Sequence, residues 1–266
     1  MPEEPEAEDG WAELADKFVD GHYGSLRGRV RTHVIDRHLR DHLVLPPARI
    51  VDVGGGAGHQ SLPLARDGYE VTIADPSAAM LARAEALLDR ESSDVVARVK
   101  LVRASAHEAP GLLGESAFDA VLCHGVMMYV EDPVTFVHCL ARLASPGAVV
   151  SIVTKNAASL AVRPALEGRW REAMDAFDGV RQINGLGVDT RADTVEELSR
   201  SMRRAGVEPL AWYGVRLFTD GWTRAMPAVD SEVDVLAVEL EASRRDPYRQ
   251  LSRLFHLVGI REACAA

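Results

Sequence analysis

The chain has 266 residues, of which 47% are hydrophobic and 26% are charged, and its formal net charge at pH 7 is −10. This composition is that of an ordinary globular protein, and it argues against a disordered, collagen-like or disulfide-built chain. The acidic balance, with a sequence pI near 5.4, argues against a general nucleic-acid coat, because phosphates are neutralised by clustered Lys and Arg, but it leaves room for a local basic groove.

The cysteines and the first residues of the chain bear on its compartment. Cys123, Cys139 and Cys264 stand at irregular spacings and form no C-x-x-C pair, so we expect neither a disulfide framework nor a metal site. Residues 1–10 are acidic and contain proline, which predicts a disordered tail rather than a signal peptide. No apolar stretch approaches the roughly 20 residues that span a bilayer. We therefore expect a cytoplasmic protein without a membrane anchor.

Residues 11–47 have a helical pattern that is interrupted at 22–25 and ends at Pro46-Pro47, which predicts a lid of two helices. Residues 48–155 alternate between short apolar runs and helical segments. The expected strands are 50–53, 70–74, 99–104, 120–123 and 148–153, and the expected helices are 59–67, one after Ser77 and one from Asp132-Pro133. Such alternation is typical of a mostly parallel sheet covered by helices on both faces.

Residues 156–266 are less regular. The pattern predicts a helix at 157–178, a loop at 184–187, a helix from the capping-box spacing Thr194–Glu197 to Gly206, a strand at 211–218, a helix at 230–244 and a strand at 254–260. We therefore expect one α/β domain over residues 11–266. In it, a cofactor-binding core is followed by an insertion after the fifth strand and by substrate-side elements.

A glycine-rich loop joins the first strand of this core to a helix. It contains Gly54, Gly55, Gly56 and Gly58, and glycine both permits positive φ and lets a ligand lie against bare backbone. The next strand ends at Asp75, about 20 residues further on, where dinucleotide-binding folds place an acid that holds two ribose hydroxyls. The alternative is a glycine-rich turn beside a solvent-facing Asp75.

Three ligands use loops of this kind. NAD prefers G-x-G-x-x-G, but His59 stands at the last glycine position, and the Gly-Lys-Ser/Thr of a phosphate-binding P-loop is missing. The loop instead reads Asp-x-Gly-x-Gly-x-Gly, with Asp52 ahead of the glycines. An acid there repels a pyrophosphate and suits a ligand that carries an ammonium group, which favours S-adenosylmethionine.

The chain resembles the class I S-adenosylmethionine-dependent methyltransferases over residues 11–260. More narrowly, it is similar to the CmoM family, which methylates the carboxylate of 5-carboxymethoxyuridine in tRNA. Besides the glycine loop, the narrower match rests on Lys17-Phe18, Tyr23-Gly24, Gly28, Arg31, Cys123-His124, Tyr213-Gly-Val-Arg-Leu-Phe218, Asp246-Pro-Tyr248 and Leu254-Phe-His-Leu257. The resemblance implies a Rossmann-like sheet of seven strands and methyl transfer from S-adenosylmethionine.

The resemblance also implies a set of cofactor residues. They are Arg31, Gly54, Gly55, Asp75, Ala106, His107 and His124, to which the loop motif adds Asp52, Gly56 and Gly58. Arg31 is a fixed cation suited to the methionine carboxylate, and Ala106-His107 would hold the adenine edge. His107 departs from the family, which commonly has an amide there. His124 taken alone is equally compatible with a packed core histidine.

A carboxylate acceptor is already ionised at neutral pH, so its methylation needs no general base. Catalysis then rests on alignment and on the exclusion of water. Residue type and family position suggest four side chains that would aim the acceptor: Tyr23, Arg216, Tyr248 and His256. Two of them have a structural alternative, because Arg216 fits a strand-face arginine at the rim and Tyr248 fits packing at a helix start.

The acceptor remains open between tRNA and a small molecule. The tRNA-modifying relatives carry a lysine-rich insertion, whereas residues 163–181 here hold arginines and acids in equal number. A tRNA substrate predicts a broad electropositive surface, for which the candidate arginines are Arg200, Arg203, Arg204, Arg244, Arg245, Arg249 and Arg253. A small-molecule O- or N-methyltransferase predicts an enclosed apolar pocket, with Trp170, Phe177, Trp212 and Trp222 as candidate linings. A protein that binds the cofactor without methyl transfer is a third alternative.

Overall fold

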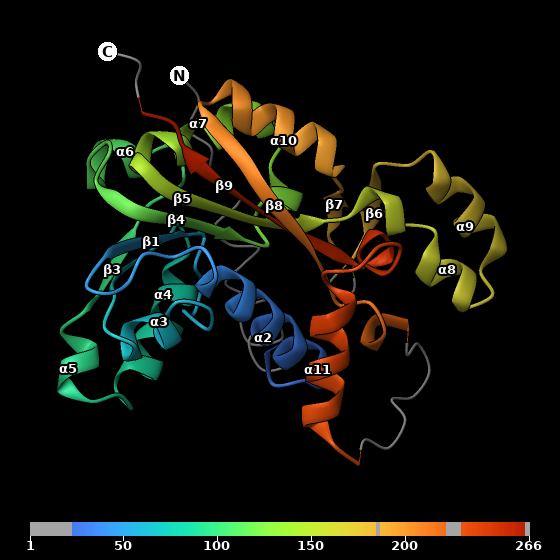
Figure 1. Ribbon diagram of the computed structural model, residues 1–266, viewed down its shortest axis with the longest axis horizontal. Coiled ribbons are helices and arrows are strands. Elements are labelled where there is room, and N and C mark those ends of the chain that lie inside the picture. The colour runs from blue at the N-terminus through green and yellow to red at the C-terminus, as the bar shows by residue number, and fades with distance from the viewer. Residues whose placement is uncertain (1–22, 185–186, 222–229, 264–266) are drawn as a thin grey trace.

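The computed structural model describes residues 23–184, 187–221 and 230–263, and its centre is a twisted sheet of seven strands with helices on both faces (Figure 1). The spatial order of the strands is β3-β2-β1-β4-β5-β9-β8. Their bounds are β1 Arg49–Val53, β2 Glu70–Asp75, β3 Val99–Arg103, β4 Phe118–His124, β5 Ala144–Lys155, β8 Val207–Val215 and β9 Leu254–Arg261. The predicted α/β class and the mostly parallel seven-stranded sheet are confirmed.

Strand direction decides which residues meet at one edge of the sheet. Strands β1 to β5 pair in parallel, and β9 is antiparallel to both of its neighbours, β5 and β8. The strands β1, β2, β4, β5 and β8 therefore end at one edge, where β9 begins. Leu254 at the start of β9 pairs with both Lys155 and Val215. Ligands of open α/β sheets bind at this carboxyl edge.

The helices form a layer on each face of the sheet (Figure 1). One layer holds α2 Leu26–Arg40, α3 Leu62–Arg66, α4 Ala78–Leu88 and α11 Glu232–Ala242, and the other holds α6 Ala109–Leu113, α7 Pro133–Leu143 and α10 Val195–Arg204. The remaining helices are α5 Ser93–Val96, α8 Val162–Leu166, α9 Trp170–Phe177 and the short 3₁₀ turns η2 Met127–Tyr129, η3 Ala157–Ser159, η4 Thr219–Gly221 and η5 Tyr248–Leu251. Helix α2 lies alongside α11.

The core follows from the alternation of side chains along each strand. In β1, Val51 and Val53 enter the apolar cluster that includes Phe136 of α7, whereas Ile50 enters the cluster that includes Leu64 of α3. A third apolar cluster joins α2 to the strands β5, β8 and β9. Each fully buried aliphatic side chain contributes roughly 1.5–3 kcal/mol, so these clusters hold the carboxyl edge in place.

The segment between β5 and β8 differs most from its prediction. The helix expected at 157–178 is divided into η3, α8 and α9, because Gly168 takes a φ of +74° and ends the helical run after α8. A two-stranded hairpin, β6 Arg181–Ile183 with β7 Asp189–Arg191, was not predicted. The capping box at Thr194 is confirmed. The predicted tail at 1–10 and the first lid helix lie outside the described residues.

Candidate active site

A pocket with about 620 Å³ of empty volume opens at the carboxyl edge of the sheet. Its walls come from the ends of three strands, since Gly54 follows β1, Asp75 ends β2 and His124 ends β4. The described residues that line it are Tyr23, Gly54, Gly55, Gly56, Asp75, Pro76, Met80, His124, Gly125, Val126 and Tyr129. The topology thus brings five predicted cofactor residues and one predicted catalytic residue, Tyr23, to a single cavity.

The glycine loop presents bare backbone to this pocket. Gly54 has a φ of +70°, and a Cβ atom there would lie 2.3 Å from Cγ2 of Val126. Gly56 has a φ of +55°, and a Cβ atom there would lie 2.6 Å from Cε of Met80. Both positions therefore need glycine for backbone conformation as well as for space.

Replacing Gly54 by Ala is expected to lower the free energy of unfolding by about 2–4 kcal/mol, from the positive φ and the overpacking against Val126. Urea unfolding measures this loss. Gly111→Ala is the matched control, because no atom lies within 4 Å of its built Cβ in helix α6 and alanine is the better helix former by up to about 1 kcal/mol. Equal stability of the two variants would contradict the requirement for glycine at position 54.

Asp75 joins the second strand to the loop. Its Oδ2 accepts the N–H of Gly56 at 2.9 Å, and its Oδ1 accepts the N–H of Ser77, also at 2.9 Å. Burial raises the pKa of the carboxyl group, and the two backbone hydrogen bonds oppose that shift. Because a carboxylate has about four acceptor positions, Asp75 can still accept from a ligand in the pocket.

Asp52 lies behind the glycine loop and is not among the residues that line the pocket. Its Oδ2 accepts from the hydroxyl of Ser61, and a Cβ on Gly55 would approach its carboxyl carbon to 2.9 Å. Burial raises the pKa of Asp52 to about 6. Its second oxygen is buried and has no hydrogen-bond partner in the described part of the chain. In this position Asp52 packs behind the glycine loop and supports its backbone.

Arg31 of α2 contacts two residues of the pocket wall, although it is not itself among the residues that line the cavity. One of its terminal nitrogens, Nη2, donates to the carbonyl oxygen of His124 at 2.9 Å, and its guanidinium carbon lies 5.7 Å from the ring centre of Tyr23. The other, Nη1, is buried and has no hydrogen-bond partner among the described residues. A buried guanidinium nitrogen with a vacant donor is a site for an anion.

The predicted catalytic His256 lies in the sheet instead of at the pocket. It is fully buried in β9, and its Nε2 is 2.7 Å from the hydroxyl of Ser151, which is 2.8 Å from Nε2 of His124. Burial lowers the pKa of His124 to about 3 and that of His256 well below its usual range, so both imidazoles are neutral at pH 7. His256 does not line the pocket, so contact between this side chain and an acceptor stays a prediction.

A third buried histidine gives the fold a pH dependence. His38 of α2 stacks on Tyr213 with ring centres 3.7 Å apart, and burial lowers its pKa to about 3. Between pH 6.5 and 3 the unfolded chain binds a proton at His38 that the folded chain does not, so stability is lost as the pH falls through this window. We expect His38→Gln to remove about 2 kcal/mol of the difference in unfolding free energy between pH 7 and pH 5. Identical pH profiles in urea unfolding would contradict this.

The other predicted site residues lie elsewhere. Ala106 is buried in the apolar core and His107 is exposed, with its ring centre 6.4 Å from that of Phe136, and neither lines the pocket. Gly58 packs against Ile73 below the loop. Tyr248 is 48% exposed beside Phe218. The predicted catalytic residue Arg216 follows β8 and forms an ion pair with Asp220.

The residues of the lining that were not predicted are Pro76, Met80, Gly125, Val126 and Tyr129. A signal for the last three was present, because they lie within five residues of the end of β4 and so stand at the carboxyl edge near His124. Tyr129 also accepts a hydrogen bond from Asn184, 3.2 Å away. The segment inserted after β5 therefore contacts the pocket wall.

Comparisons with known proteins agree with this geometry. Residues 51–152 match the model of a family described as a methyltransferase domain. An Escherichia coli tRNA 5-carboxymethoxyuridine methyltransferase is 26% identical over 93% of this chain and 94% of its own length. A ubiquinone biosynthesis O-methyltransferase of Xanthomonas euvesicatoria is 31% identical over 86% of this chain and 91% of its own length. The chain belongs to the class I S-adenosylmethionine-dependent methyltransferases.

A solved structure supports the same fold for this methyltransferase. An S-adenosylmethionine-dependent methyltransferase from Thermotoga maritima superposes with a TM-score of 0.60 at 16% identity, covering 96% of this chain and 99% of that one. The cofactor of the methyltransferase is S-adenosylmethionine. None of the helices described is long and apolar enough to cross a membrane. Within the same residues, no group of three or more His, Cys, Asp or Glu is arranged to hold a metal ion.

Proposed function

We propose that the protein transfers the methyl group of S-adenosylmethionine to the carboxylate of 5-carboxymethoxyuridine at the wobble position of tRNA, in the cytoplasm. The observation that carries this proposal is the extent of the similarity to the tRNA methyltransferase of E. coli, which spans 93% of this chain. It therefore includes substrate-side elements as well as the cofactor half. Two methyltransferases that shared only a cofactor motif would match over the region from β1 to β5.

The residues of the pocket fit the cofactor. The bare backbone of Gly54 to Gly56 forms part of the pocket wall, and a Cβ atom on these residues would clash with Val126, Asp52 or Met80. Asp75 would accept two ribose hydroxyls, and Nη1 of Arg31, which is buried without a hydrogen-bond partner in the described residues, would donate to the methionine carboxylate. When bound, the cofactor supplies a methyl group on a positively charged sulfur. Two predicted ligands of the cofactor, Ala106 and His107, do not line the cavity.

The protonation state of the pocket suits an acceptor that is already ionised. His124 lines the cavity as a neutral imidazole with a pKa of about 3, which makes it a weak base at pH 7. A carboxylate acceptor needs no proton removed, so the protein's part is to align the acceptor and to exclude water. Tyr23 and Tyr129 supply hydroxyl groups in the wall for this alignment.

A small-molecule acceptor is the second candidate, and paired arginines favour it. Of the arginines expected to bind RNA, five have a carboxylate partner: Arg203 with Glu208, Arg244 with Asp41, Arg245 with Glu241, Arg249 with Asp246 and Arg253 with Asp220. Such pairing weakens the electropositive surface that tRNA requires. The similarity to a ubiquinone O-methyltransferase points the same way. Trp170 and Phe177 are about 70% exposed, so they do not enclose an apolar pocket.

The experiment that separates the two acceptors uses tritiated S-adenosylmethionine and total tRNA from a host strain that lacks this protein. Label that enters tRNA and is released by mild alkali identifies a methyl ester and supports the wobble uridine. The control is to show that the cofactor binds and that the tRNA contains carboxymethoxyuridine. No transfer under those conditions contradicts the tRNA proposal and favours a small molecule.

A further inference from the structure

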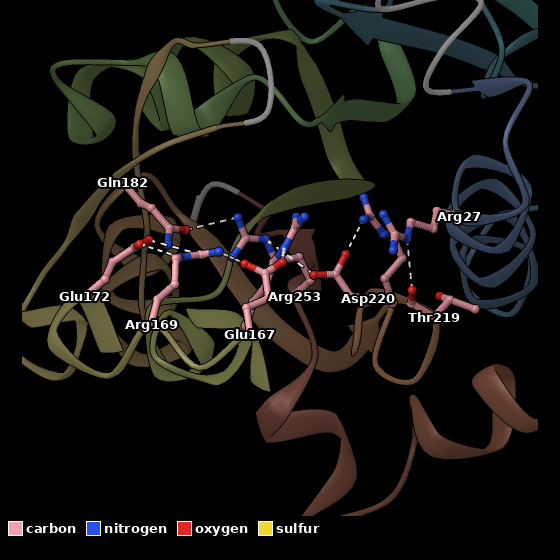
Figure 2. A network of polar contacts seen from close by, with 10 residues as sticks. Arg27, Glu167, Arg169, Glu172, Gln182, Thr219, Asp220 and Arg253 are labelled. Atoms are coloured by element: carbon pink, nitrogen blue, oxygen red, sulfur yellow. Dashed lines mark hydrogen bonds and ion pairs between the residues drawn. The ribbon is translucent and has the colours of Figure 1, made fainter. Parts of the chain in front are cut away.

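Four arginines surround one buried carboxylate at the carboxyl edge of the sheet (Figure 2). The carboxylate is Asp220 of η4, and its side chain is 8% exposed. Arg216 forms an ion pair with Oδ1 of Asp220, and Nε of Arg253 lies 3.9 Å from Oδ2. The positive charges of Arg27 and Arg163 also lower the pKa of the Asp220 carboxyl group. We call Arg27, Arg163, Arg216, Arg253 and Asp220 the Asp220 cluster.

The Asp220 cluster carries an excess of positive charge. Two further carboxylates lie nearby: Glu167 is 3.0 Å from Arg163 and is shared with Arg169, and the buried Glu239 accepts from the N–H groups of Leu217 and Thr219. Burial and the charges of its arginine neighbours lower the pKa of Arg253, against the effect of Asp220. Arginines held this close together, in a partly desolvated site, repel one another unless an anion lies between them.

Two guanidinium nitrogens of the cluster have a vacant donor. Nε of Arg216 and Nη1 of Arg253 are buried and, within the described residues, have no hydrogen-bond partner. The side chains that bear them are only 11% and 14% exposed. Buried polar groups in native proteins are nearly always paired, so vacant donors on two neighbouring arginines indicate an acceptor that the chain itself does not provide.

A cavity lies beside these donors. It has about 250 Å³ of empty volume, and its polar lining comes from Ser159, Arg163, Asp220 and Arg253. Asp220 also holds Arg216 next to this cavity through their ion pair. Part of this volume is open to solvent, from which an oxyanion such as a phosphate or carboxylate group can reach the guanidinium groups, which bind it with two hydrogen bonds.

The Asp220 cluster is a neighbour of the cofactor pocket. Arg27 and Arg31 are one turn apart on α2, where side chains at i and i+4 lie about 5–6 Å apart. Arg27 donates to the carbonyl oxygen of Thr219 at 2.9 Å, whereas Arg31 donates to that of His124. Arg216 follows β8 and Arg253 precedes β9 at the same sheet edge.

We propose that the Asp220 cluster binds an oxyanion, a carboxylate or a phosphate, of the methyl acceptor and so holds the acceptor next to the cofactor pocket. The assignment of the anion to the acceptor rests on the proposed function. Anion binding by the cluster does not, because it depends only on the arginines and can be measured without methyl transfer.

The test measures thermal unfolding with inorganic phosphate and, separately, with acetate, each at 10 mM and against sodium chloride of equal ionic strength. For a site with millimolar affinity, we expect phosphate or acetate to raise the unfolding midpoint of the natural protein by about 3 °C. Arg253→Gln should abolish this rise. Arg142→Gln should retain it, because Arg142 lies on α7 and pairs with Glu115 away from the cluster.

The outcomes separate the sources of the anion. A rise with phosphate alone assigns a phosphate, and a rise with acetate assigns a carboxylate. No rise in the natural protein, or an equal rise in Arg253→Gln, overturns the proposal. If Arg253→Gln does not fold, Arg216→Gln takes its place, since Arg216 carries the other vacant donor.

A second readout distinguishes this proposal from the proposed function. Calorimetry of S-adenosylmethionine should give the same Kd for Arg253→Gln and the natural protein, because Arg253 does not line the cofactor pocket. Anion binding without methyl transfer to tRNA leaves the cluster intact as a site and contradicts the tRNA acceptor. Methyl transfer to tRNA with full activity in Arg253→Gln contradicts the cluster instead.

Discussion

Replacing Asp75 by Ala is expected to lower the affinity for S-adenosylmethionine at least about 100-fold. The carboxylate is placed to accept two ribose hydroxyls, and hydrogen bonds to a charged group contribute about 1.5–3 kcal/mol each. The substitution also leaves the N–H groups of Gly56 and Ser77 without their acceptor, which loosens the loop on which the cofactor lies. Isothermal titration of S-adenosylhomocysteine measures the effect without turnover.

Two further variants separate the ribose contact from the loop contact. Asp75→Asn keeps one oxygen acceptor for the loop but loses the charge, so we expect an intermediate affinity. Asp119→Asn is the matched control, because Asp119 accepts from the N–H of Arg49 at the opposite end of β1, 2.7 Å away. An affinity for Asp75→Ala within threefold of the natural protein would refute the assignment of Asp75 to the ribose.

Replacing Arg31 by Met should remove the preference of the protein for ligands that carry the methionine carboxylate. The natural protein should bind S-adenosylhomocysteine more tightly than 5′-methylthioadenosine, which lacks that carboxylate. A buried charge-assisted pair with Arg31 accounts for a factor of about 10–100 in this preference. In Arg31→Met we expect the ratio of the two Kd values to fall by this factor, while any contact with the ammonium group, which 5′-methylthioadenosine also lacks, keeps its effect.

The comparison of two ligands guards against a merely structural effect. Arg31→Met also leaves the carbonyl oxygen of His124 without its donor, which would weaken both ligands alike. Only a contact with the carboxylate makes the loss selective for S-adenosylhomocysteine. Equal losses for both ligands would assign Arg31 to the support of the pocket wall.

The cofactor half of the fold could be predicted from sequence because its signals are local. The alternation of strands and helices in the sequence indicated a parallel sheet. Parallel strands bring Gly54, Asp75 and His124 to one edge of the sheet, whichever conformation the loops adopt. What could not be predicted were the contacts that depend on distant segments. His256 follows the same motif logic, but its β-strand pairs with β5, and Ser151 then lies against its ring.

The segment after β5 was harder to predict for a similar reason. The helical pattern of the sequence continues on both sides of Gly168, so the pattern did not show that the helix ends there. Strands β6 and β7 have three residues each, which is too short for a clear alternation of side chains. The Asp220 cluster could not be predicted, because its members come from α2, α8, η4 and the residues next to β8 and β9, and they meet only in the folded chain. Arg216 was singled out as a residue that aims the acceptor, but nothing local showed its partner to be Asp220.

We assign the cofactor to the cavity formed by the glycine loop, Asp75 and His124. A crystal structure with S-adenosylhomocysteine tests this assignment. We expect the ribose hydroxyls to lie within hydrogen-bond distance of Asp75, and the methionine carboxylate to lie within hydrogen-bond distance of Nη1 of Arg31. Ligand density outside this cavity, or a carboxylate that points away from Arg31, would contradict it.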